Sequence, residues 1–247
     1  MNNLGEKYKK TVNFFTVVFI IVLFAACVAL VILKYHVEGE GNMPFELSSI
    51  MIISNAEGIQ KEETRATWDM ELMQNNDIYI EISKNKKYKE TEVIEEIILD
   101  NFKTIVEPQK GTPKIYRPTE NENLIYEYKD EYIVDDKLKY IGAEKTNIKN
   151  LEIANQGGMI MFRYANNSLG EYISDEEEVK HDGTLLSKID IKNEEIKFKV
   201  AFDITIKLKS EKEYKAKIEL DLPAGNVIEE GTSSYEKTTF KDVVFKR

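Results

Sequence analysis

The sequence has few of the residues that most often carry chemistry. Cysteine occurs once, as Cys27, and histidine twice, as His36 and His181. A single cysteine excludes a disulfide within this chain, and Cys27 lies inside an apolar run, which excludes a thiol nucleophile elsewhere. Zinc-site spacings, a glycine-rich phosphate loop and a serine-hydrolase elbow are also missing. A hydrolase would therefore need a pair of carboxylates that only the fold brings together.

A long apolar run is present, and it determines how the chain is organised. Residues 14–33 contain no charged side chain. At a rise of about 1.5 Å per residue, such a helix covers about 30 Å, the thickness of the hydrocarbon core of a bilayer. We expect a transmembrane helix over residues 12–33. Its large apolar side chains would contact the lipid, among them Val12, Phe15, Phe19, Leu23, Leu30 and Leu33.

The flanks of this helix predict its orientation. The tail, residues 1–11, contains Lys7, Lys9 and Lys10, whereas Glu38 and Glu40 follow the helix. Basic flanks remain cytoplasmic, so we expect a single-pass protein of the cell membrane with its C-terminal part extracytoplasmic. Residues 34–42 would be a short stalk. Two alternatives are a cleavable signal peptide, for which the apolar core is too long, and a lipoprotein signal, after which a polar tether should follow.

The charge balance limits the partners of the region 43–247. The chain has 44 acidic and 34 basic residues, a net charge of −10. A surface with this balance repels nucleic acid and anionic lipid headgroups and attracts cations or basic proteins. We therefore expect no nucleic-acid partner. Contact with the bilayer would be made by the apolar helix alone.

Alternating apolar residues predict that residues 43–247 are mostly β-strand. Trp68, Met70 and Leu72 alternate with polar residues, and the pattern resumes at residues 78–82 after the sequence QNND, which predicts a hairpin turning at 74–77. Further strands are expected at residues 45–54, 90–107, 159–165 and 240–246, with loops at 56–66 and 166–172.

The clearest pattern lies near the end of the chain. Even positions are apolar from 196 to 208 and again from 214 to 222. A hairpin about Glu211 would place Ile204 opposite Ile218, with one face buried and the other solvated. The fold class expected is an all-β antiparallel sandwich. A proline-rich segment, 107–123, is either a loop inside one sandwich or the boundary between two in tandem.

Two features suggest binding. Tyr126, Tyr128, Tyr132 and Tyr140 are separated by even intervals, which in an extended chain places them on one face, as a partner-binding surface or as a half-buried strand. An acidic stretch contains Asp175, Glu177, Glu178 and Asp182. These carboxylates suit calcium, although their order differs from that of known calcium loops and a solvated acidic turn explains them as well. No other cofactor is indicated.

Four segments carry a resemblance to known proteins. They are NMPFELSSIMIISNAEG at 42–58, NNDIYIEI at 75–82, VKHDGTLL at 179–186 and LDLPAGNVIEEGTSS at 220–234. Together they resemble an uncharacterised group of bacterial proteins with a single span and a β-rich outer part. The resemblance implies no activity. We expect a non-catalytic protein that binds, scaffolds or assembles in the cell envelope with a protein partner; the alternatives are a sensor for a cation or a cell-wall ligand and a carboxylate-dependent hydrolase.

Overall fold

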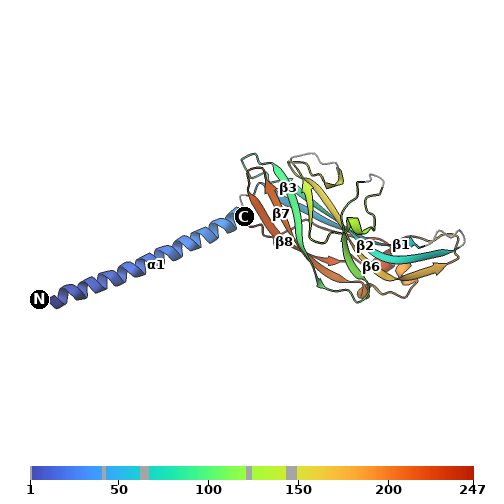
Figure 1. The fold of residues 1–247 in the computed structure, drawn as a ribbon, viewed down its shortest axis with the longest axis horizontal. Helices are drawn as coiled ribbons and strands as arrows, with labels where there is room; N and C mark the ends of the chain where they lie inside the picture. The colour runs from blue at the N-terminus through green and yellow to red at the C-terminus, as the bar shows by residue number, and fades with distance from the viewer. Residues whose placement is uncertain (1, 41–42, 62–66, 121–123, 143–148) are drawn as a thin grey trace.

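The computed structural model describes residues 2–40, 43–61, 67–120, 124–142 and 149–247, and within 2–40 the side chains of 12 and 14–32. One long helix precedes a β-rich region (Figure 1). The elements are α1 (Asn2–Glu40), β1 (Phe45–Gln60), β2 (Trp68–Lys84), β3 (Ile94–Val106), β4 (Thr112–Tyr116), β5 (Lys137–Ile141), β6 (Gly158–Ser174), α2 (Thr184–Ser187), β7 (Phe198–Leu208), β8 (Glu213–Leu222), α3 (Val227–Glu230) and β9 (Ser233–Lys237).

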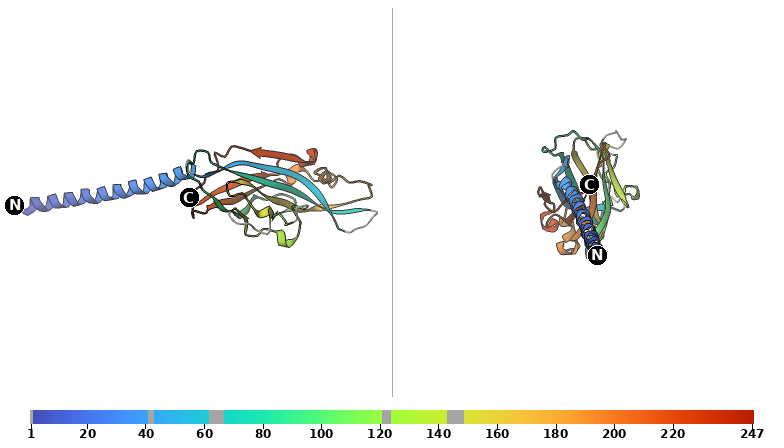
Figure 2. Two further views of the ribbon diagram at one scale, coloured as in Figure 1. Left: turned by 90° about the horizontal axis from the view of Figure 1, so that it is seen from above. Right: turned by 90° about the vertical axis from the view of Figure 1, so that its left-hand side faces the viewer.

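The strands form two sheets. Sheet A has the order β4-β6-β2-β1-β9, and sheet B has the order β5-β3-β7-β8; every neighbouring pair is antiparallel. The sheets lie face to face, as Figure 2 shows, so the predicted antiparallel sandwich is confirmed. Strands from before and after residues 107–123 share each sheet, and β4 lies within that segment. The segment is therefore part of one sandwich.

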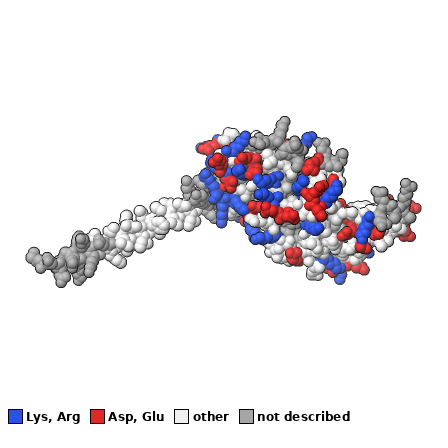
Figure 3. Space-filling model, viewed as in Figure 1, with Lys and Arg blue, Asp and Glu red and all other residues white. Residues whose placement is uncertain are grey.

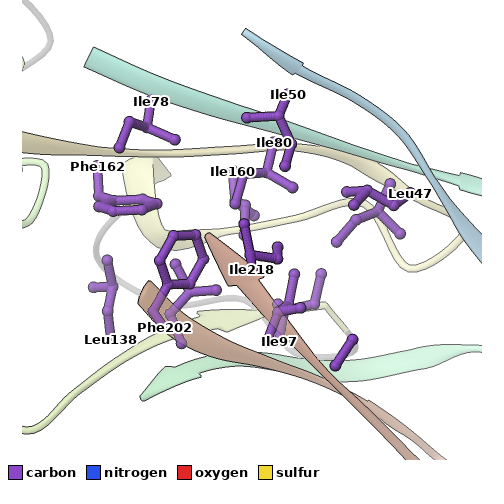
Figure 4. Packing of buried hydrophobic residues seen from close by; sticks show 14 of the residues in the cluster. Leu47, Ile50, Ile78, Ile80, Ile97, Leu138, Ile160, Phe162, Phe202 and Ile218 are labelled. Carbon is purple, nitrogen blue, oxygen red and sulfur yellow. The ribbon is translucent and has the colours of Figure 1, made fainter. Parts of the chain in front are cut away.

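Apolar side chains on the inner faces of both sheets form the main core. Because successive residues of a strand point to opposite faces, every second residue faces the other sheet. Ile78 and Phe162 of sheet A pack towards Phe202 of sheet B (Figure 4). The rings of Phe162 and Phe202 meet edge to face, with centroids 5.3 Å apart. Burial of these chains is the main force that holds the sheets together.

The β7–β8 hairpin confirms the predicted face and corrects the predicted register. Ile204 lies opposite Ala216, and Phe202 lies opposite Ile218, a shift of two residues from the prediction. The loop closes at Leu208, whose N–H donates to the carbonyl of Lys212 over 2.9 Å, and Glu211 adopts φ 62°. A loop ending in a left-handed residue is a common three-residue hairpin connection. A shift of two leaves the buried set unchanged, so the apolar pattern could not select between the registers.

Strand β2 passes straight through residues 74–77, so the predicted turn there is wrong. The side-chain amides of Gln74 and Asn76 pair reciprocally, with Nε2 to Oδ1 at 2.8 Å and Nδ2 to Oε1 at 3.1 Å. Ser54 Oγ donates to Asn76 Oδ1 over 2.7 Å. These buried groups are satisfied by one another, so the strand continues despite its turn-favouring residues. The predicted loop at 166–172 is wrong because β6 continues through it, and the predicted loop at 56–66 is wrong as far as Gln60, where β1 ends; residues 62–66 lie outside the described residues.

A second apolar cluster lies beyond the buried amides of Gln74 and Asn76, at the end of the sandwich far from α1. We call it the far cluster. It joins sheet A to the short helices α2 and α3 and to the segment before β7. Its buried members are Ala56, Met70, Leu72, Leu169, Val179, Leu185, Leu186, Ile191, Ile196 and Val227. This cluster covers the long strands where sheet B no longer does.

Two further predictions concern the chain ends. A final strand at 240–246 is wrong: the last strand is β9, and the later segment makes one isolated bridge, between Lys246 and Lys215. Helix α1 is continuous and projects from the sandwich (Figure 1). Its stretch Phe14–Ile32 is long and apolar enough to cross a membrane, and none of it is buried.

The predicted lipid-facing side chains can be placed on α1. Val12, Phe15, Phe19, Leu23 and Leu30 are exposed. The side chain of Leu33 lies outside the described residues. The predicted stalk is helical as far as Glu40, and residues 41 and 42 are not described.

Candidate binding hollow on sheet A

Charged side chains gather on the outer face of sheet A, where β1, β2 and β6 lie side by side. Ile78 and Phe162 point into the core, so their neighbours Asp77 and Arg163 point outward. Asp77 and Arg163 are register partners on adjacent strands. Glu57 lies on β1 close to the same arginine. The regular alternation of three paired strands thus brings these charges together.

Arg163 is held by contacts at all its guanidinium nitrogens. Nε donates to Asp77 Oδ1 over 2.6 Å, and Nη2 donates to Asp77 Oδ2 over 2.9 Å. Nη1 donates to the hydroxyl of Tyr128 over 2.5 Å and lies 4.0 Å from Glu57 Oε1. A two-pronged pair of this kind fixes both position and orientation. The arginine is therefore a rigid part of the sheet surface.

Burial and pairing act in opposite directions on this arginine. Burial lowers the pKa of Arg163, but the hydrogen bonds and the charge of Asp77 outweigh it, so the pKa is raised above its ordinary value. Burial also raises the pKa of the Tyr126 and Tyr128 hydroxyls. At neutral pH the arginine is charged and both tyrosines are protonated.

Tyrosines from the segment between β4 and β5 frame the arginine. The guanidinium carbon of Arg163 lies 4.4 Å from the ring centre of Tyr126 and 5.8 Å from that of Tyr128. The ring of Tyr128 meets that of Tyr116 edge to face at 5.2 Å. Beside them, the guanidinium of Arg117 lies 4.8 Å from the ring centre of Tyr132. These cation–π contacts hold an irregular segment against the sheet.

Backbone hydrogen bonds fix the ends of this segment. Arg117 N donates to Tyr132 O over 2.9 Å, and Val134 N donates to Ile115 O over 2.9 Å. Thr119 N donates to Ile125 O over 2.8 Å. These bonds tie the described parts of the segment, residues 117–120 and 124–134, to each other and to β4.

A hollow of about 600 Å³ lies between this segment and the sheet. We name it the tyrosine hollow; it is lined by Glu57, Ile59, Asp77, Leu124, Ile125, Tyr126, Glu127, Tyr128, Lys129 and Arg163. Its rim exposes aliphatic side chains, with Leu124 49% exposed, Ile125 40% and Ile59 36%. The Tyr126 hydroxyl is buried and has no hydrogen-bond partner among the described residues. Exposed aliphatic side chains around a polar floor are typical of a surface that binds something.

Three of the four predicted tyrosines meet at this place. Tyr126, Tyr128 and Tyr132 belong to one cluster over sheet A. Tyr140 does not: it lies on β5, is 0% exposed in the main core, and donates a hydrogen bond to the carbonyl of Met161. Its inclusion in an exposed face is wrong. Even spacing implies a shared face only in extended chain, and a 3₁₀ turn at Asp130–Tyr132 interrupts it.

The acidic stretch is arranged differently from a metal site. Asp182 is directed inward, where it accepts from Thr184 N over 2.9 Å and pairs with Lys180. Asp175, Glu177 and Glu178 are exposed. Across the described ranges, no three histidine, cysteine, aspartate or glutamate side chains form a group suited to a metal ion. Calcium binding by the acidic stretch stays a prediction.

Sequence patterns missed the three charges at the floor of the hollow. Asp77 lay in the supposed turn, so its partner across the sheet could not be inferred. Arg163 had a usable signal, because it is the charged residue of the apolar strand MIMFRYA and a buried arginine needs a carboxylate. Glu57 lay in the supposed loop.

Three carboxylates line the hollow, on Glu57, Asp77 and Glu127. Asp77 uses both oxygens on Arg163, and Glu127 pairs with Lys129. The positive charge of Arg163 is likewise already balanced by Asp77. No family model, curated protein or solved structure matches the chain.

Proposed function

We propose that this chain is a single-pass protein of the cell membrane whose β-sandwich binds a protein partner through the tyrosine hollow, without catalysis. The observation that carries the proposal is the exposed aliphatic rim, Ile59, Leu124 and Ile125, around a rigid Arg163–Asp77 pair. Such a rim favours an apolar side chain of a partner, and rigid surroundings reduce the entropy lost on binding.

The membrane part of the proposal depends on α1. A stretch of entirely exposed apolar residues, Phe14–Ile32, needs lipid around it. The basic tail with Lys7, Lys9 and Lys10 supports a cytoplasmic N-terminus and an extracytoplasmic sandwich. A signal peptide removed after export is the competing interpretation. N-terminal sequencing of the protein from cells separates the two, since an anchor leaves residue 1 or 2 in the membrane fraction.

The binding part is tested by photo-crosslinking in intact cells. A benzophenone amino acid at Leu124 should give one discrete adduct, because that side chain stands at the rim. The control places the same amino acid at Ile105, which is 47% exposed and does not line the hollow. An Ile125→Asp substitution should abolish the Leu124 adduct. Equal adducts at both positions, or an adduct unaffected by Ile125→Asp, would refute the proposal.

A further inference from the structure

The end of the sandwich that joins α1 is formed by segments distant in sequence. Glu40 ends α1 and Met43 begins the sandwich, so two residues separate them and their Cα atoms lie at most about 11 Å apart. Asn85 ties the β2–β3 loop to this point: its Nδ2 donates to Met43 O over 2.9 Å, and its N–H donates to Pro44 O over 2.8 Å. The β2–β3 loop therefore lies beside the end of α1.

Two other segments meet the β2–β3 loop. The turn of the β7–β8 hairpin reaches it through Lys209 N, which donates to Val93 O over 3.0 Å, and through Lys212, whose Nζ lies 2.7 Å from Glu92 Oε1. The C-terminal segment 240–245 lines a hollow together with Met43 and Phe45. Figures 1 and 2 both show the C-terminus beside the point where α1 leaves the sandwich.

These segments make this end basic although the chain is acidic overall. We call it the basic end; its charged residues are Lys84, Lys86, Lys87, Lys89, Lys209, Lys212, Lys241, Lys246 and Arg247, against Glu46, Glu90, Glu92, Glu211, Glu213 and Asp242, and Glu38 and Glu40 precede it on α1. All four lysines of the β2–β3 loop are exposed. Within the described part of the chain, Lys84, Lys86, Lys87 and Lys89 enter no ion pair. Figure 3 shows basic side chains gathered where the sandwich meets α1.

We propose that the basic end binds the anionic headgroups of the same membrane that holds α1. Helix α1 runs eight residues past Ile32, a rise of about 12 Å, of which the headgroup layer covers about 6 Å. The end of α1 therefore lies within about a Debye length, roughly 10 Å, of the headgroups, where an anionic leaflet attracts basic side chains. The net charge alone favoured repulsion from such lipid; the placement of the charges favours attraction at this one end. The remaining acidic surface is repelled, so the contact orients the sandwich with its far end away from the membrane.

The proposed contact also determines how far the tyrosine hollow lies from the membrane surface. The tyrosine hollow lies on the outer face of sheet A, beyond the level of the basic end, since β1 and β6 run away from α1 before they reach Glu57 and Arg163. An upright sandwich holds this hollow clear of the headgroups. A freely tilting sandwich would not.

Fluorescence quenching on the full chain in lipid nanodiscs tests the proposal. In a Cys27→Ser background, an introduced cysteine at Thr91, exposed in the β2–β3 loop, carries a fluorophore, and a quencher is attached to lipid headgroups. Discs of phosphatidylcholine are compared with discs containing about 30% phosphatidylglycerol. We expect quenching at Thr91 to rise about twofold with the anionic lipid and the rise to disappear in roughly 1 M salt. A label at Ser187, at the far end, should show no rise.

Charge reversal supplies the matched control. A variant with Lys84, Lys86, Lys87 and Lys89 changed to Glu should lose the rise; a variant with Lys103, Lys114, Lys137 and Lys197 changed to Glu alters the net charge equally and should keep it. Changing the first four lysines to Gln guards against misfolding and should also remove the rise. Equal quenching of an intact, disc-bound chain in both lipids overturns the proposal. Because it rests on the membrane anchor proposed above, that anchor's failure is recognised separately, as a shortened chain in the soluble fraction of cells.

Discussion

Arg163 on β6 and Asp77 on β2 face each other across the sheet and are joined by two parallel hydrogen bonds of 2.6 and 2.9 Å. Both side chains are largely buried, with 13% and 18% exposed. The pair thus links two neighbouring strands of sheet A and also forms the floor of the tyrosine hollow. Loss of either partner leaves a charge with too little water to stabilise it.

Removal of both partners should therefore cost less than the sum of the two single removals. We expect Arg163→Met or Asp77→Leu alone to lower the free energy of unfolding by about 3 kcal/mol, and the double variant to cost less than the sum by about 2 kcal/mol. Urea unfolding of the full chain in micelles measures all four corners of this cycle. Additive costs would contradict the pairing.

The amide pair inside β2 gives a second prediction. Asn76 accepts from Ser54 and Gln74 and donates to Gln74 and to the carbonyl of Tyr164 at 3.2 Å. Asn76→Leu keeps the size but leaves these buried groups without partners, so we expect a loss of about 3 kcal/mol. Asn150→Leu removes one hydrogen bond near the surface and should cost about 1 kcal/mol or less. Thermal melting of both variants measures the two losses of stability.

Sequence patterns predicted the sandwich and its inner faces but not the length of its strands. The residues Gln74–Asp77 and Asn166–Ser168 favour turns, and a local rule assigns them to turns. In the structure, β2 and β6 pair with each other through both segments, and Ser54 and Gln74 donate hydrogen bonds to Asn76; this is information held in long-range pairing and not in local sequence. The extended strands in turn create the far cluster and the tyrosine hollow.

The same limit applies to the candidate surfaces. Tyr126, Tyr128 and Tyr132 were found by their spacing, but nothing local distinguishes them from Tyr140, which the β3–β5 pairing draws into the core. The lysines of the basic end were visible in KNKKYK, yet a net charge of −10 concealed them. Only the placement of three segments around the end of α1 brings them to one end of the sandwich.

The ion pair that joins two loops of the basic end predicts a dependence on pH. Burial raises the pKa of Glu92, but hydrogen bonds from Lys212 and Ser210 outweigh it, so the pKa is lowered. The hydrogen bond to Glu92 raises the pKa of Lys212. A lowered carboxyl pKa means that the stabilisation is present above the ordinary value of about 4.3 and is lost as pH falls through the lower folded value. For Lys212 it is present below about 10.4 and lost as pH rises beyond that.

Glu92→Gln should therefore cost about 2 kcal/mol at pH 7, and this difference from the unchanged protein should vanish between pH ~4 and pH ~2. Glu90 lies in the same loop and is exposed, and among the described residues it accepts a hydrogen bond from the Tyr88 hydroxyl over 3.3 Å. Glu90→Gln should change stability by less than about 0.5 kcal/mol across the range. Melting temperatures of the full chain between pH 2 and 7 give the measurement. A constant difference for Glu92→Gln would show that the ion pair is not its cause.

The far cluster depends on a glycine where helix α2 begins. Gly183 N donates to Gly231 O over 2.7 Å, and a Cβ added at Gly183 would lie 1.9 Å from the carbonyl oxygen of Val227. Because that oxygen is backbone, Gly183→Ala must push α2 and α3 apart, at a cost of about 3 kcal/mol. A Cβ at Gly158 meets its nearest atom, in the side chain of Ile153, at 3.3 Å, so Gly158→Ala should cost about 1 kcal/mol or less. Hydrogen exchange distinguishes the cases: Gly183→Ala should raise exchange at Leu185 and Leu186 while leaving β7 protected, and unchanged exchange there would contradict the close packing of the two helices.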